Sequence, residues 1–116
     1  MKASDRFFVE GVRCTVLGAQ LPVANLSVGG FYVASEQTPI LGQILDLEMG
    51  LGERPAFKMS GRVTWVNDPA DPQAAELPRG FGIKIIRIDF QDKLAIVDFL
   101  KRIVHDEDGA SGTRAR

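Results

Sequence analysis

The sequence predicts a mainly β domain of six short strands, arranged as an antiparallel barrel or sandwich and followed by one C-terminal α-helix. Apolar residues alternate with polar or small residues in several short stretches, which is the period of a half-buried strand. Glycine- and proline-containing turns separate these stretches at short intervals, which favours antiparallel all-β architecture over βαβ units. After residue 89 the apolar spacing changes to steps of three and four, the period of an amphipathic helix.

The first predicted strand covers residues 8–16, where Phe8, Val12, Cys14 and Val16 share one face. The second covers residues 21–26, and its proline favours an edge position. Aromatic and β-branched residues predict a third strand. Apolar alternation predicts a fourth, a fifth and a sixth strand, and the sixth continues toward residue 88. These four strands cover residues 31–34, 45–49, 57–65 and 81–85. Gly61 in the middle of the fifth predicts a bulge or a bend.

The predicted helix begins near Asp89, which can cap it, and runs for about four turns. Its expected apolar face is formed by Phe90, Leu94, Val97, Leu100, Ile103 and Val104. Residues 1–6 are expected to be a flexible N-terminal arm and residues 7–104 a single domain. The charged, glycine-rich residues 105–116 are expected to be a disordered tail.

Composition excludes several classes of protein. The chain has 116 residues with 14 Lys and Arg and 15 Asp and Glu, so it lacks the strong positive charge of a non-specific nucleic-acid binder. No apolar run is long enough to span a bilayer, and no signal peptide is evident, so membrane insertion is not expected. A single cysteine cannot form an internal disulfide. We therefore expect a reduced, cytoplasmic protein.

Catalytic and metal-binding constellations are nearly absent. The only histidine, His105, stands near the predicted helix end, and Cys14 alternates with core residues. A zinc site or a Cys–His dyad has too few residues from which to form, so no enzyme activity, cofactor or metal site is expected. Trp65 is in phase with apolar neighbours and is expected in the core.

One polar turn is a candidate binding site. Asn25, Ser27, Gly29 and Gly30 link the second and third strands, and turn geometry with local backbone hydrogen bonds can account for all four. Lys2 and Arg6 precede the first strand and lie four residues apart, on one face of an extended arm. Two cations over a small polar turn suit an anionic, guanine-like ligand, because an arginine presents a planar fork to guanine.

These residues resemble a known family. Asn25-x-Ser27-x-x-Gly30 is similar to the (Asp/Asn)-x-Ser-x-x-Gly motif of PilZ domains, and residues 80–85, Gly-Phe-Gly-Ile-Lys-Ile, resemble their late Gly-x-Gly strand. The resemblance covers roughly residues 2–104. It implies a six-stranded antiparallel β-barrel, the PilZ-like split barrel, with a C-terminal helix. It also implies a receptor for the bacterial second messenger cyclic di-GMP.

In the family, an Arg-x-x-x-Arg pair clamps the ligand, and Lys2 and Arg6 occupy those two positions here. The resemblance thus implies a ligand site of Lys2, Arg6, Asn25, Ser27, Gly29 and Gly30. Lys2 keeps the charge but lacks the planar fork, so weakened binding is expected.

Two hypotheses follow from this departure. In the first, the chain binds cyclic di-GMP and acts in trans on an unidentified effector protein. In the second, it no longer binds the nucleotide and is an adaptor for motility, pilus or polarity machinery. The adaptor would dock through exposed apolar residues near Tyr32 or on the helix.

Overall fold

The computed structural model describes residues 6–68, 70, 77–106 and 113–115. In chain order the elements are β1 (Arg6–Phe8), β2 (Val12–Val16), β3 (Ala19–Leu26), β4 (Gly30–Ala34), β5 (Ile44–Leu51), β6 (Phe57–Asn67), β7 (Gly80–Ile88), α1 (Phe90–Asp106) and β8 (Thr113–Ala115). Lys2 of the predicted site lies outside the described residues.

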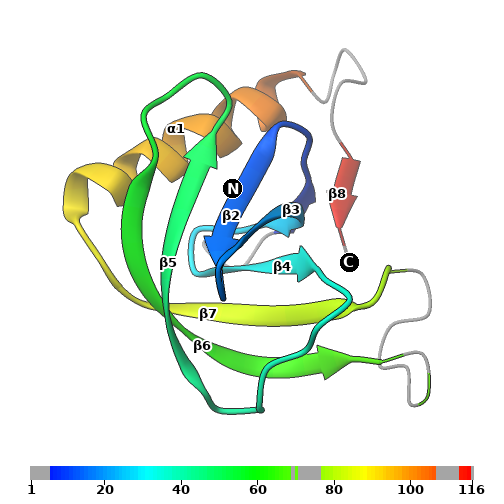
Figure 1. Cartoon of the computed structure of the whole chain (residues 1–116). Helices are drawn as coiled ribbons and strands as arrows, with labels where there is room; N and C mark the ends of the chain where they lie inside the picture. The colour runs from blue at the N-terminus through cyan, green and yellow to red at the C-terminus, as the bar shows by residue number, and fades with distance from the viewer. Residues whose placement is uncertain (1–5, 69, 71–76, 107–112, 116) are drawn as a thin grey trace.

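Six of the strands close into a ring. Neighbours pair in the order β2-β5-β6-β7-β4-β3, and β3 pairs back with β2 to complete the barrel. Every pairing is antiparallel. The first half of β3 pairs with β2 and its second half with β4, so this one strand joins both sides of the barrel (Figure 1). The predicted six-stranded antiparallel barrel with a C-terminal helix is confirmed.

The first predicted strand, residues 8–16, is wrong in its extent. The chain breaks it at Gly11, where φ is +73°, into β1 and β2. A left-handed backbone angle cannot continue a strand, and glycine adopts it without a steric penalty. β1 therefore leaves the ring and pairs with the second half of β3, with Phe7 opposite Leu26 and Phe8 opposite Asn25.

The C-terminal residues also differ from expectation. α1 continues to Asp106, beyond the expected boundary at residue 104. Residues 113–115, expected in a disordered tail, form β8, which pairs with the free edge of β1. β1 is thus a strand between β3 and β8, and it carries Arg6 of the predicted site.

Alternating side chains fill the barrel interior. The inward residues of β2 and β5 are all buried, as are Phe31, Phe81 and Ile83 from β4 and β7. α1 lies across one end of the barrel and joins this core through Ile96 and Leu100, which are fully buried (Figure 1). Within the described residues, no helix has the length and apolar character needed to cross a bilayer.

The predicted apolar face of the helix is only partly correct. Leu100 is buried and Val97, Ile103 and Val104 are partly buried, but Phe90 is 67% exposed and Leu94 is 41% exposed. Ala95 and Ile96 are buried instead. The barrel covers the arc around Ile96 and Leu100, which leaves a second apolar ridge on the outside of α1.

Candidate functional site

The predicted motif forms a tight turn between β3 and β4. Ser27 is buried, and its backbone N–H donates to the Gly30 carbonyl at 2.8 Å. Its hydroxyl accepts a hydrogen bond from the Gly30 N–H at 3.0 Å and donates to the Gly30 carbonyl at 3.0 Å. Ser27 therefore closes the turn, and both hydrogen-bonding functions of its hydroxyl are engaged there.

The two motif glycines have different surroundings. A Cβ on Gly30 would lie 2.4 Å from the carbonyl oxygen of Ile83, because β4 approaches β7 closely at this position. A Cβ on Gly29 would meet nothing within 4 Å. The Gly29 carbonyl accepts a hydrogen bond from the Ile85 N–H at 2.9 Å, so the turn is fixed to β7 while its outer surface stays open. Gly30 is required for packing, whereas Gly29 lets another molecule approach the backbone.

A row of side chains crosses the outer face of the barrel beside this turn. The strand register pairs Phe8 with Asn25, Asn25 with Tyr32, and Tyr32 with Gly82, which also pairs with Trp65. The rings of Tyr32 and Trp65 stack, with centroids 4.9 Å apart and planes at 29°. Asn25 therefore lies between the strand that carries Arg6 and a pair of stacked aromatic rings.

The position of Trp65 corrects the sequence analysis, which placed it in the core. A register shift between Val63 and Trp65 changes the phase of β6, so Trp65 turns to the outer face while Val63 stays inside. Gly82 makes room for it, because a Cβ there would lie 1.9 Å from the indole nitrogen. Periodicity alone gives no signal of this bulge.

Tyr32 is fully buried although its ring is on the outer face. Trp65 covers the ring, and the hydroxyl donates to the Pro78 carbonyl, which also accepts from the Asn67 amide at 3.4 Å. Burial raises the pKa of the Tyr32 hydroxyl above its ordinary value. Tyr32 is itself buried and supports the Trp65 ring from beneath.

Asn25 has an unusual hydrogen-bonding state. Only 3% of it is exposed, and its side-chain oxygen has no hydrogen-bond partner in the described structure. A buried amide oxygen without a partner costs about 1–3 kcal/mol, because its hydration is lost without replacement. Such an oxygen can accept a hydrogen bond from a ligand.

Cations surround the turn on the same outer face. Arg6 alternates with the inward-facing Phe7, so it projects on the side of Asn25, one residue from the Phe7–Leu26 pair. On the other side of the turn, Gly30 pairs with Lys84, which pairs with Arg62. In the described part of the chain the ion pairs are made by Arg79, and neither Lys84 nor Arg62 has one.

Like charges directly opposite each other on neighbouring strands repel. The Lys84–Arg62 pair therefore favours an anion beside Gly30. The sequence gives no sign of this pair, because both residues have the spacing of ordinary solvent-facing positions and only the strand register brings them together.

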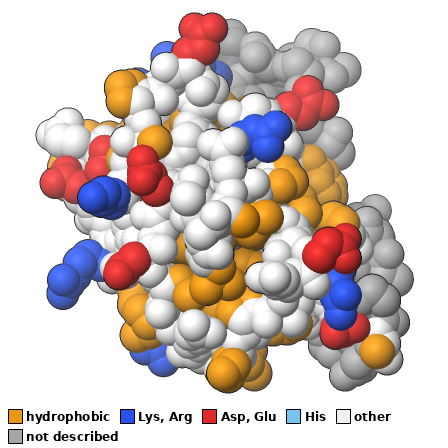
Figure 2. All heavy atoms as spheres, in the orientation of Figure 1, with side chains coloured by type: hydrophobic (Ala, Val, Ile, Leu, Met, Phe, Trp, Pro, Cys, Tyr) orange, Lys and Arg blue, Asp and Glu red, His pale blue; other side chains and the backbone are white. Residues whose placement is uncertain are grey.

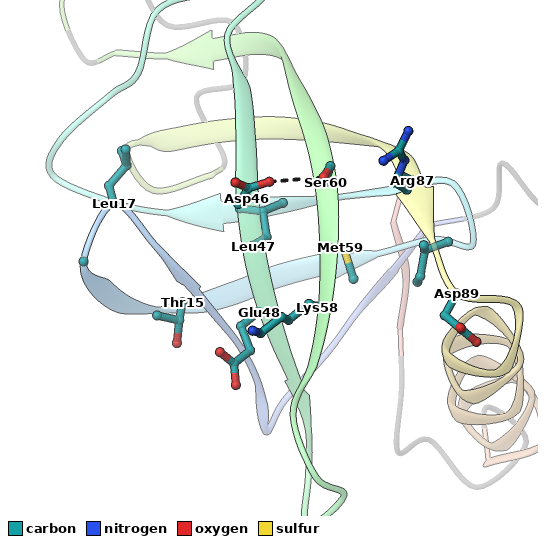
Figure 3. Close-up of a pocket in the computed structure, with 12 residues that line it drawn as sticks. Thr15, Leu17, Asp46, Leu47, Glu48, Lys58, Met59, Ser60, Arg87 and Asp89 are labelled. Atoms are coloured by element: carbon teal, nitrogen blue, oxygen red, sulfur yellow. Dashed lines mark hydrogen bonds between the residues drawn. The ribbon is translucent and has the colours of Figure 1, made fainter.

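A hollow of the described surface lies away from the motif turn. It has a volume of about 580 Å³ and lies over β2, β5, β6 and the end of β7 (Figure 3). Its ionisable lining residues are Asp46, Glu48, Lys58, Arg87 and Asp89, and Asp46 accepts a hydrogen bond from Ser60 at 3.2 Å. Carboxylates outnumber cations there, so this hollow does not suit an anionic ligand.

The described residues contain no group of three or more metal-ligating side chains. The thiol of Cys14 is buried inside the barrel, and burial raises its pKa to about 12. A thiol with so high a pKa stays protonated at neutral pH and is a poor nucleophile.

Comparisons with known proteins agree with this architecture. A sequence model of the PilZ domain matches residues 8–102. The chain resembles the solved structure of the inhibitor of motility MotI (DgrA) from Bacillus subtilis, with a TM-score of 0.62 and 19% identity over 90% of this chain and 49% of that one. The PlzA protein of Borreliella burgdorferi, solved in complex with cyclic di-GMP, gives a TM-score of 0.52 and 16% identity over 85% of this chain and 40% of that one.

An uncharacterised Legionella protein gives a TM-score of 0.58 and 11% identity, over 89% of this chain and 97% of that one. Among curated proteins no significant match is found. The chain spans about half the length of the Bacillus protein and less than half the length of the Borreliella protein. At these identities the structural likeness shows a shared fold.

Proposed function

We propose that this chain, which belongs to the PilZ domain family, binds cyclic di-GMP beside the motif turn and acts in trans on a partner protein. PilZ domains are a family of cyclic di-GMP receptors that are generally not catalytic. The observation that carries the proposal is the unpartnered amide oxygen of Asn25, buried beside the aromatic stack on a face with several cations. The structural likeness to a protein solved with cyclic di-GMP supports it.

Each part of cyclic di-GMP has a suitable neighbour on this face. A guanine edge donates N–H groups, which can satisfy the Asn25 oxygen. The half-buried ring of Trp65 offers a stacking surface, and base–aromatic stacking is worth about 1–3 kcal/mol per base. Arg6 and Lys84 supply positive charge for the two phosphates. The open surface of Gly29 lets the ligand reach the turn.

Calorimetric titration with cyclic di-GMP at low salt tests this proposal. We expect binding that weakens as salt is added, because phosphate contacts release counterions. Arg6→Ala should weaken binding about tenfold or more, whereas Arg13→Ala, an exposed arginine on β2, should not. Lys2→Arg should strengthen binding about ten- to a hundredfold, since it adds a planar fork.

The second candidate is an adaptor that does not bind the nucleotide. The exposed ridge of Phe90 and Leu94 on α1 favours it, because large apolar side chains on a surface mark interaction sites. Absence of binding at millimolar cyclic di-GMP, in the native chain and in Lys2→Arg alike, would exclude the receptor function. Unchanged cellular function in Arg6→Ala would then favour the adaptor.

A further inference from the structure

A groove runs beside the motif turn, between the end of β7 and the first turn of α1. Its volume is about 510 Å³, and it is lined by Val28 and Gly29 of the turn, by residues 85–88 of β7, and by Phe90 and Lys93 of α1. Five of the eight lining residues have apolar side chains. Ile86 is 44% exposed, and Phe90, which also lines the groove, is 67% exposed.

A bulge accounts for the exposure of Ile86. Gly61 of β6 pairs with Ile85, and the preceding residue, Ser60, pairs with Arg87, so Ile86 has no partner on β6. This is the irregularity that Gly61 predicted. As a result Ile86 and Arg87 are both exposed instead of alternating between the two faces. Phe90 and Leu94 follow one helical turn apart and extend the same apolar surface.

The ionisable side chains that line the groove are both positively charged. Its two ionisable lining residues are Arg87 and Lys93, which are exposed and have no ion pair in the described part of the chain. The acidic residues Asp89, Asp92 and Asp98 belong to the same region of the chain but do not line the groove. An occupant must therefore combine large apolar groups with carboxylates.

We propose that this groove binds an acidic amphipathic segment of a partner protein. One or two large apolar side chains of the segment fill the groove against Ile86 and Phe90, and its carboxylates face Arg87 and Lys93. This inference rests on the action in trans proposed above and not on nucleotide binding. The groove has the helix-in-groove form, in which apolar anchors of an amphipathic helix enter a cleft.

Two other occupants fit less well. An anionic membrane presents a flat surface, and Asp98, exposed one turn after Leu94, would be repelled by it. A two-fold dimer would use the same patch on both copies, which brings Arg87 and Lys93 toward their own equivalents. Charge complementarity favours the acidic segment over both.

The groove is physically joined to the motif turn. Gly29 lines it, and the hydrogen bond from the Ile85 N–H to the Gly29 carbonyl joins the motif turn to β7, which forms one wall of the groove. A nucleotide on the turn would therefore border the same wall that the partner segment contacts.

The test uses the full chain and a fluorescein-labelled synthetic peptide of about five helical turns, with Leu at amphipathic spacing and Glu at the remaining positions. A second peptide has Lys in place of Glu. Fluorescence anisotropy should show binding of the Glu peptide and not of the Lys peptide. Phe90→Ser and Lys93→Glu should each weaken binding about tenfold or more, equivalent to about 1.4 kcal/mol.

The matched controls are Ile40→Ser and Lys101→Glu. Ile40 is 77% exposed and lies in the connection between β4 and β5. This connection runs to the bottom of Figure 1, and Figure 2 shows hydrophobic side chains on the lower part of the surface in the same view. Lys101 is an exposed cation on α1 that does not line the groove. Both control variants should bind the Glu peptide as the native chain does.

Equal binding of the two peptides, or equal loss in the control variants, would overturn the inference. So would binding to vesicles containing anionic lipid that depends on Phe90 and Lys93, or a dimer in sedimentation that Phe90→Ser dissociates. Cyclic di-GMP titration of Phe90→Ser keeps the two proposals separate. Peptide binding without nucleotide binding would support the groove as a peptide-binding site and exclude the receptor function.

Discussion

Gly30→Ala should destabilise the barrel far more than Gly29→Ala, although the two glycines are adjacent in one motif. The new methyl group at Gly30 would lie 2.4 Å from the Ile83 carbonyl oxygen, about 1 Å inside ordinary contact. That oxygen belongs to the backbone of β7 and cannot rotate away, so β4 must separate from β7 around the Gly30–Lys84 pair.

The magnitude follows from two contributions. Overpacking of this kind costs about 1–3 kcal/mol, and one or two weakened ladder hydrogen bonds add about 0.5–1.5 kcal/mol each. We expect a loss of about 2–4 kcal/mol, which lowers the Tm of a domain of this size by about 10–25 °C. Thermal and urea unfolding followed by circular dichroism measure it.

Gly29→Ala is the matched control, because its methyl group enters open space and its φ is not in the left-handed region. Its free energy of unfolding should stay within about 0.5 kcal/mol of the native value. The packing role of Gly30 would be refuted if the Gly30→Ala variant melted within about 2 °C of the native chain, or if both variants lost the same free energy of unfolding. Either result would show that Gly30 is not needed for packing more than Gly29 is.

Three further predictions concern buried polar groups. Asn25→Leu should leave the free energy of unfolding unchanged or raise it by about 1–2 kcal/mol in urea unfolding, because it removes a buried oxygen that lacks a partner, while calorimetry shows loss of cyclic di-GMP binding. Tyr32→Phe should cost about 1 kcal/mol in the same urea assay, since the Pro78 carbonyl keeps its hydrogen bond from Asn67. Burial raises the pKa of the Cys14 thiol to about 12 in the folded chain, whereas the ordinary pKa of the thiol, which applies to the unfolded chain, is 9.0. The free energy of unfolding therefore does not depend on this thiol below pH 9.0, and it decreases as the pH rises from 9.0 toward 12. Relative to Cys14→Ala, the native chain should lose about 1.4 kcal/mol at pH 10 in urea unfolding, and an equal pH dependence in both would contradict the burial of the thiol.

Much of the barrel follows from local sequence patterns. Apolar alternation in residues 45–49 locates β5, and the Gly-x-Gly pattern of residues 80–82 marks the two places where β7 meets the Val33 carbonyl and the Trp65 ring. Such signals are local, because they depend on the side chains of one strand and on the space beside them.

Other features depend on contacts between distant strands and could not be predicted in this way. The outward turn of Trp65 and the exposure of Ile86 result from bulges. Gly61 predicts an irregularity in β6, but its effect on Ile86 of the neighbouring strand β7 follows only from the register between the two strands. The Lys84–Arg62 pair exists only because β6 and β7 have a particular register. The exposed ridge of α1 arises because the barrel covers the arc around Ile96 and Leu100 and leaves Phe90 and Leu94 among the polar residues of the outer side.

The motif itself separates into residues that build the turn and residues that the turn presents. Ser27 and Gly30 are fully engaged by the fold, so any barrel with this turn has a use for them, with or without a nucleotide. Asn25 is not used in this way, because its buried side-chain oxygen has no hydrogen-bond partner among the described residues. The case for a nucleotide receptor over a pure adaptor therefore depends on Asn25, and on the neighbouring Arg6 and Trp65, far more than on the presence of the motif.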